Sequence, residues 1–151
     1  MNEPLVGIIM GSKNDMPAME ACTQQLEEFG VPYELIVASA HRNPDKVHEW
    51  ASTADARGIK VIIAAAGKAA HLAGVVAAFT TLPVIGVPIK TSDLGGMDSL
   101  LSMVQMPGGV PVACVAINGS KNAAILATQI IATEKSNYKD ILIKFKKDMA
   151  V

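Results

Sequence analysis

The sequence has few aromatic residues, few cysteines and few arginines. Aromatic side chains make up only 4% of the 151 residues, although half of the chain is hydrophobic. We therefore expect a core of Ala, Val, Ile, Leu and Met, in which small residues let helices pack closely on a sheet. Cys22 and Cys114 have neither a CxxC partner nor metal-ligand spacing. We interpret them as buried thiols of a reduced, cytoplasmic protein.

An excess of either charge is also missing. The chain has 13 basic and 14 acidic residues, and its net charge is -1. This balance gives no bulk electrostatic reason to expect a nucleic acid or an anionic membrane as a partner. No apolar run approaches the roughly 20 residues of a membrane-spanning helix. A strand-like pattern begins at Leu5, so we expect no signal peptide.

Short apolar runs alternate with helical patterns along the whole chain. The runs with strand character cover residues 5–10, 33–37, 61–65 and 83–87, with a fifth inside 110–117. The helical patterns cover about 15–30, 44–58, 72–79, 97–104, 121–133 and 137–149. No hairpin signal separates the strands, so the pattern predicts a parallel sheet with helices on both faces. We predict one α/β domain over residues 1–151, a three-layer αβα sandwich with a flavodoxin-like sheet of about five strands.

Polar residues gather in the turns that follow the first three predicted strands. In an open parallel sheet, ligands bind beyond the carboxyl ends of the strands. These turns therefore meet at one edge and form a candidate site. The candidate site residues in these turns are Ser12, Asp15, Ser39, His41, Arg42, Gly67, Lys68 and His71.

Two of these turns could hold an anion. Gly11 and Ser12 precede a helix N-terminus, where free N–H groups and the helix dipole favour a phosphate. Arg42 could hold a phosphate through paired hydrogen bonds. The residues are also compatible with a plain turn, capped by Asp15, and a solvated arginine. The turn is neither a P-loop nor a GxGxxG fingerprint, so neither a nucleoside triphosphate nor a dinucleotide is indicated.

The three histidines suggest acid–base chemistry more than metal binding. His41 stands beside Arg42 at the ligand edge, and an imidazole can both donate and accept a proton near neutral pH. A purely structural role for His41 remains open, as does a packed role for His71. His48 falls on the polar face of the second helix, and we expect it to be exposed. The spacing of the three is not a zinc motif, so no metal is expected.

Four segments together resemble the PurE family. They are Met10-Gly-Ser-Lys-Asn-Asp15, Ser39-Ala-His-Arg-Asn-Pro-Asp45, the run from Gly67 to Gly74, and Asp98-Ser-Leu-Leu-Ser-Met-Val-Gln-Met-Pro-Gly-Gly109. The likeness covers nearly the whole chain in the same order. The Ser-Ala-His-Arg segment is similar to the bacterial branch, the N5-carboxyaminoimidazole ribonucleotide mutases of purine biosynthesis. The related branch, which carboxylates aminoimidazole ribonucleotide directly with CO2, typically has a lysine where Arg42 stands.

The resemblance implies an isomerase that moves a carboxylate from an exocyclic nitrogen to the adjacent ring carbon. It implies that Ser12, Asp15 and Arg42 bind the ribonucleotide and that His41 is the acid–base residue. Ser39, Gly67 and His71 would line the same pocket. It further implies a homo-octamer with active sites near subunit contacts, and a reaction without metal, ATP, biotin or nicotinamide.

The chain departs from the family pattern at two positions. The family usually has Gly-Gly-Ala-Ala-His-Leu-Pro-Gly, whereas here Lys68 replaces the second glycine and Ala73 replaces the proline. Lys68 adds bulk and charge where a close backbone approach to the substrate is expected. Because of Lys68, a catalytically weakened ribonucleotide-binding module stays open as an alternative. A direct CO2-dependent aminoimidazole ribonucleotide carboxylase is the alternative among enzymes.

Overall fold

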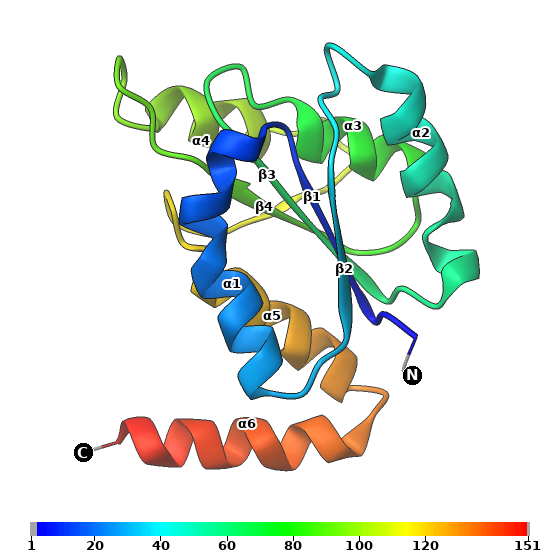
Figure 1. Ribbon diagram of the computed structural model, residues 1–151, viewed down its shortest axis with the longest axis vertical. Coiled ribbons are helices and arrows are strands. Elements are labelled where there is room, and N and C mark those ends of the chain that lie inside the picture. Colours follow the sequence, from blue (N-terminus) through cyan, green and yellow to red (C-terminus); the bar gives the residue numbers. More distant parts are fainter. Residues whose placement is uncertain (1–2, 151) are drawn as a thin grey trace.

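The chain folds into a parallel sheet between two layers of helices (Figure 1). The computed structural model describes residues 3–150. The strand order is β2-β1-β3-β4-β5, and every pairing is parallel. The strands are β1 Val6–Met10, β2 Tyr33–Val37, β3 Val61–Ala66, β4 Val84–Pro88 and β5 Ala113–Cys114. The predicted three-layer α/β architecture is confirmed.

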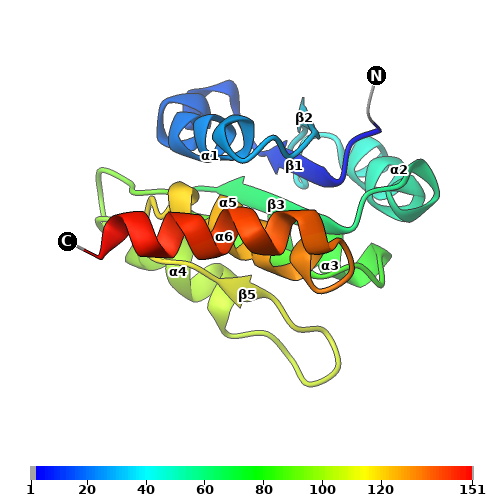
Figure 2. The ribbon, with the colours of Figure 1, turned by 90° about the horizontal axis from the view of Figure 1, so that it is seen from below.

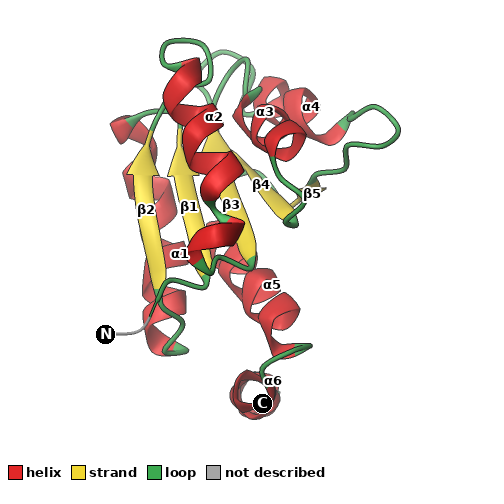
Figure 3. Ribbon diagram, turned by 90° about the vertical axis from the view of Figure 1, so that its right-hand side faces the viewer, coloured by secondary structure: helices red, strands yellow, loops and turns green. Residues whose placement is uncertain are grey.

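Residues 3–150 contain six α-helices, of which α1 to α5 cover the two faces of the sheet and α6 lies beyond its end (Figure 3). They are α1 Met16–Glu28, α2 Pro44–Thr53, α3 Leu72–Phe79, α4 Met97–Val104, α5 Ser120–Ala132 and α6 Ser136–Met149. Helices α1 and α5 pack on one face, where α6 extends their core, and α2, α3 and α4 pack on the other. Two short 3₁₀ helices, Lys13–Asp15 and Asp55–Arg57, adjoin α1 and α2.

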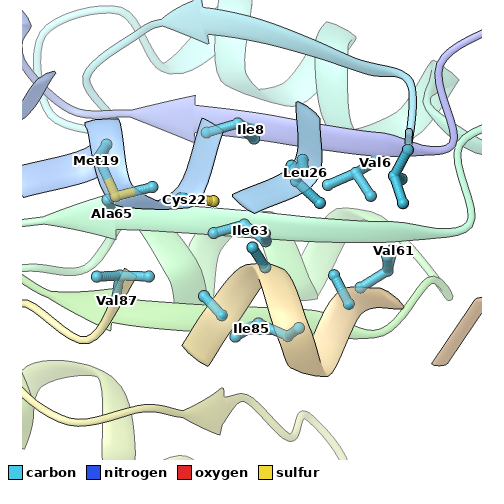
Figure 4. Packing of buried hydrophobic residues seen from close by; sticks show 14 of the residues in the cluster. Val6, Ile8, Met19, Cys22, Leu26, Val61, Ile63, Ala65, Ile85 and Val87 are labelled. Atoms are coloured by element: carbon cyan, nitrogen blue, oxygen red, sulfur yellow. The ribbon is translucent and has the colours of Figure 1, made fainter. Parts of the chain in front are cut away.

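The sheet separates two aliphatic cores. On one face, Ile8 and Ile63 contact the helix side chains Met19 and Leu26, all fully buried (Figure 4). The opposite face packs its strand residues against Trp50 of α2 and against α3 and α4. Burying strands on both faces explains why they read as continuous apolar runs. This rigid sheet fixes where the loops at its carboxyl edge begin.

Three predicted element ends differ from the structure. Asp15 does not cap α1, because its carboxylate is turned back to the N–H of Ser12. The helical pattern to Gly58 is interrupted: α2 ends at Thr53, and a 3₁₀ turn intervenes before Gly58, which has a φ of 94°. Pro88 lies within β4 as its last residue, since a strand end tolerates the missing N–H.

Helix α6 lies across the ends of α1 and α5 (Figures 1 and 2). Phe145 packs edge-on against Phe29, with ring centroids 5.2 Å apart. Ile143 on the same helix is 61% exposed. Within residues 3–150, no helix is both long enough and apolar enough to cross a membrane.

Candidate functional site

The strand register brings four turns together at one edge of the sheet. Met10 at the end of β1 pairs with Val37 of β2 and Ala65 of β3, and Ala65 pairs with Val87 of β4. The turns after these strands surround a pocket of about 580 Å³. All the candidate residues line it: Ser12, Asp15, Ser39, His41, Arg42, Gly67, Lys68 and His71. The predicted gathering of the three turns is confirmed, whereas the chemical role of each residue stays a prediction.

The turn after β1 is held by a reciprocal pair of hydrogen bonds. The N–H of Ser12 donates to Asp15 Oδ2 at 3.2 Å, and the N–H of Asn14 donates to Ser12 Oγ at 3.1 Å. Asp15 is buried, and this burial raises the pKa of its carboxyl, although the Ser12 N–H partly opposes the rise. The turn is therefore capped and preorganised before α1. The N–H groups of Ser12 and Asn14 are already engaged within it, so the Ser12 hydroxyl is the group that it can offer to an anion.

The turn after β2 presents His41 and Arg42 to solvent. The Arg42 N–H donates to Ser39 Oγ at 3.2 Å, and Asn43 caps α2 by accepting from Lys46 N–H, as predicted. Within residues 3–150 the Arg42 guanidinium forms no salt bridge. An exposed arginine without an acidic partner is available to an anionic ligand.

The imidazoles of His41 and His71 meet across the pocket. His41 Nε2 lies 3.0 Å from His71 Nδ1, and the two rings are nearly perpendicular at 81°. The turns that carry them follow β2 and β3, which lie on either side of β1. One of the two nitrogens must carry the shared hydrogen, so each ring constrains the tautomer of the other. His71 is exposed and contacts His41, so the packed role left open above does not describe it. His48 is exposed, as predicted.

The turn after β3 holds Lys68 in an unusual backbone conformation. Its φ is 55°, in the left-handed region that favours glycine. The Lys68 carbonyl accepts from Ala70 N–H at 2.8 Å and from Ser102 Oγ at 3.3 Å. Lys68 therefore adopts, under strain, a backbone conformation that a glycine would adopt freely. Ala73, the other departure, is buried in the first turn of α3, where an alanine and a proline are both compatible with a helix.

The turn after β4 supplies pocket residues that the sequence analysis missed. Ile89, Lys90, Thr91 and Ser92 all line the pocket. Lys90 N–H donates to Asn118 Oδ1 at 2.9 Å, and Thr91 Oγ1 donates to Asp98 Oδ1 at 2.8 Å. The rule that ligands bind at the carboxyl ends of parallel strands applies to β4 as well, so it could have found them.

Comparisons with known proteins agree on one family. The family model described as AIR carboxylase matches residues 5–151. The N5-carboxyaminoimidazole ribonucleotide mutase of Thermotoga maritima is 59% identical over 95% of this chain and 82% of that protein. The mutase of Pyrococcus horikoshii is 57% identical over 97% of this chain and 83% of that protein.

Another relative has a different name and a longer chain. The phosphoribosylaminoimidazole carboxylase of Saccharomyces cerevisiae is 57% identical over 96% of this chain but only 25% of its own length. The crystal structure of Treponema denticola PurE superimposes with a TM-score of 0.89 at 31% identity, and the match covers 97% of this chain and 92% of that one. The resemblance seen in the four sequence motifs is thereby confirmed, and the chain belongs to the AIR carboxylase (PurE) family.

Proposed function

We propose that this protein is an N5-carboxyaminoimidazole ribonucleotide mutase of purine biosynthesis. It converts that compound to 4-carboxy-5-aminoimidazole ribonucleotide, with the cytoplasm as its place of action. The observation that carries the proposal is the meeting of His41 and His71 at 3.0 Å in a pocket that also contains Arg42 and the Ser12 turn. An anion-binding end and a proton-transfer end thus share one pocket. The names of the relatives in Thermotoga and Pyrococcus support the same reaction.

The phosphate and ribose bind at the β1 and β2 turns. Arg42 has no acidic partner among the described residues, and its planar fork suits two phosphate oxygens. The Ser12 turn adds a hydroxyl near the start of α1, where the helix dipole favours an anion. Asp15 accepts hydrogen bonds from ribose hydroxyls. Ser39 and the Gly67 turn line the pocket around the imidazole base.

The first chemical step is decarboxylation at the exocyclic nitrogen. The bond between this nitrogen and the carboxylate carbon breaks, and its electron pair stays on the nitrogen. The nitrogen takes a proton from His41, and CO2 is released beside the ring. The products of this step are CO2 and aminoimidazole ribonucleotide, both still bound.

The second step forms the new carbon–carbon bond. The electron-rich ring carbon attacks the carbon of CO2 and becomes tetrahedral. His41, now neutral, removes the proton from this ring carbon and restores aromaticity. One proton has left His41 and one has returned, so the isomerisation is balanced without a cofactor. A single imidazole can serve both transfers because the exocyclic nitrogen and the accepting ring carbon are bonded to the same ring atom and so lie only two bonds apart.

CO2 must stay in the pocket between the two steps. Holding it beside the ring replaces a bimolecular encounter, and apolar walls offer it no competing polar partner. Ala66, Ala69 and Leu72 line the pocket and supply such a wall. Ala70, next to Ala69 in the same turn, is fully buried.

A homo-octamer is part of the proposal. Met97, Leu101 and Val104 are between 42% and 54% exposed, although α4 is an amphipathic helix with a buried Met103. An unpartnered apolar helix face of this kind is typical of subunit contacts. Light scattering on the eluting protein should give eight times the chain mass. A monomer would contradict this part of the proposal.

Two substrates distinguish the mutase from the alternative carboxylase. The purified protein is given N5-carboxyaminoimidazole ribonucleotide in one assay, and aminoimidazole ribonucleotide with bicarbonate in the other. The ultraviolet absorbance of the common product is followed in both. We expect efficient turnover of the first substrate only. Turnover of the second at a comparable rate would assign direct carboxylation, and binding without turnover of either would assign a binding module.

Two variants test the separate roles proposed for His41 in proton transfer and for Arg42 in ribonucleotide binding. His41→Asn should abolish turnover without unfolding the protein, because His41 is exposed and its loss opens no cavity. His48→Asn is the matched control and should retain activity. Arg42→Ala should chiefly weaken ribonucleotide binding, whereas Lys139→Ala on the remote helix α6 should not. Near-normal turnover by His41→Asn, or unchanged binding by Arg42→Ala, would refute the role assigned to that residue.

A further inference from the structure

The charged side chains that line the pocket are unbalanced. The lining has three cations, Arg42, Lys68 and Lys90, and within residues 3–150 its only acidic residue is Asp15. Asp15 is buried and already accepts a hydrogen bond from the Ser12 turn. A phosphate held by Arg42 would leave two cations without an anionic partner from the ligand. The pocket therefore suits a ligand with a second negative group.

Lys68 stands on a turn whose backbone is held by hydrogen bonds, while its ammonium is exposed. Its carbonyl oxygen is held by Ala70 N–H and by Ser102 of α4, so the backbone at this residue is fixed. Its ammonium lies 3.6 Å from Asp93 Oδ2, and the two side chains are 68% and 76% exposed. An ion pair this exposed contributes little free energy and exchanges readily for another anion.

The sheet order separates Lys68 from the proposed phosphate seat. The Arg42 turn follows β2 and the Lys68 turn follows β3, and β1 lies between these strands. Two strand spacings amount to about 10 Å. A ribonucleotide anchored by its phosphate at Arg42 thus extends its base towards the β3 turn, past the His41–His71 pair.

We infer that Lys68 forms a second anion subsite, which binds the migrating carboxylate of the substrate and product. This inference rests on the proposed function. The ammonium exchanges Asp93 for the carboxylate when the ligand binds. Lys68 is then a specificity-determining residue: it favours carboxylated aminoimidazole ribonucleotides over aminoimidazole ribonucleotide, which has the same phosphate and ribose but no carboxylate.

Calorimetric titration with the two stable ribonucleotides tests the inference. The probes are 4-carboxy-5-aminoimidazole ribonucleotide and aminoimidazole ribonucleotide. Lys68→Met keeps the length of the side chain and the backbone penalty but removes the charge. It should weaken binding of the carboxylated probe about three- to fivefold, the range of an exposed ion pair, and leave the other unchanged. Lys68→Arg should bind both probes as the unmodified protein does.

Asp93→Asn provides an independent measurement, because it removes the competing anion and leaves Lys68 in place. It should tighten binding of the carboxylated probe and leave binding of the other unchanged. Equal effects of Lys68→Met on both probes, or no effect on either, would overturn the inference while the unmodified protein still turns over its substrate. If the unmodified protein binds neither probe, the proposed function itself is wrong.

Discussion

The left-handed backbone at Lys68 makes a stability prediction that needs no assumption about function. We compare Lys68→Gly with Lys68→Ala. Both variants lose the ammonium and its contact with Asp93, so the ion pair cancels in the comparison. What remains is the φ of 55°, which a glycine adopts freely and an alanine does not.

The expected difference follows from two opposing effects. The left-handed conformation costs a residue with a Cβ about 1–2 kcal/mol. Glycine has more freedom in the unfolded chain, and this costs about 0.5–1 kcal/mol relative to alanine. Lys68→Gly should therefore be more stable than Lys68→Ala by about 0.75 kcal/mol, the difference between the midpoints of these two ranges. For a domain of this size the difference corresponds to about 1–4 °C in Tm.

Urea unfolding of the two variants, followed by circular dichroism, measures this difference. The two curves should have the same slope and different midpoints, since the surface exposed on unfolding is unchanged. If Lys68→Ala is at least as stable in urea as Lys68→Gly, the reasoning is refuted, because the backbone at residue 68 is then not strained.

Three further substitutions have defined outcomes. Gly7→Ala would place a methyl carbon 2.9 Å from the ring of Trp50 and should lower the free energy of unfolding by about 1–3 kcal/mol. Urea unfolding, followed by the fluorescence of the single tryptophan, measures this loss. Unchanged stability would contradict the packing described. Asp15→Asn should stabilise the fold at neutral pH, because burial raises the pKa of the Asp15 carboxyl and its charged form is disfavoured. Its advantage should vanish as the pH falls towards the ordinary value of 3.8, and an advantage independent of pH would contradict this cause. Ser120→Ala removes a 2.5 Å hydrogen bond to the Ala18 carbonyl between α5 and α1, and should cost about 1 kcal/mol in the same unfolding assay; no loss would show that this bond is not stabilising.

Much of the fold could be predicted because local signals and tertiary packing agree. The range of β2, residues 33–37, and the ranges of α3 and α4 match the predictions at both ends. Helix α6 begins at Ser136, one residue before the predicted start near 137. The sequence did not predict the change from α-helix to 3₁₀ helix after Thr53, nor the 3₁₀ helix that ends at Asp15. The two kinds of helix have similar residue preferences and differ in whether the backbone hydrogen bonds span three or four residues.

The sequence predicts which turns form the site, but not how the side chains and backbone in those turns are placed. The carboxyl-end rule places His41 and His71 at one edge, yet their contact depends on how two turns pass over β1. The strain at Lys68 is likewise invisible in the sequence, because a lysine has no intrinsic preference for the left-handed region. Lys90 and the other residues after β4 were not assigned to the site, because their turn contains neither a histidine nor an arginine and nothing in the sequence marks Lys90 as reactive.

The central claim is that CO2 is released and recaptured within one pocket, and an isotope experiment tests it directly. The substrate is prepared with ¹³C in the migrating carboxylate and turned over in unlabelled bicarbonate buffer. Mass spectrometry of 4-carboxy-5-aminoimidazole ribonucleotide then gives the fraction of label retained. We predict that nearly all of the label is retained. Product carrying unlabelled carboxylate from the buffer would contradict the account, because the CO2 would then have come from solution.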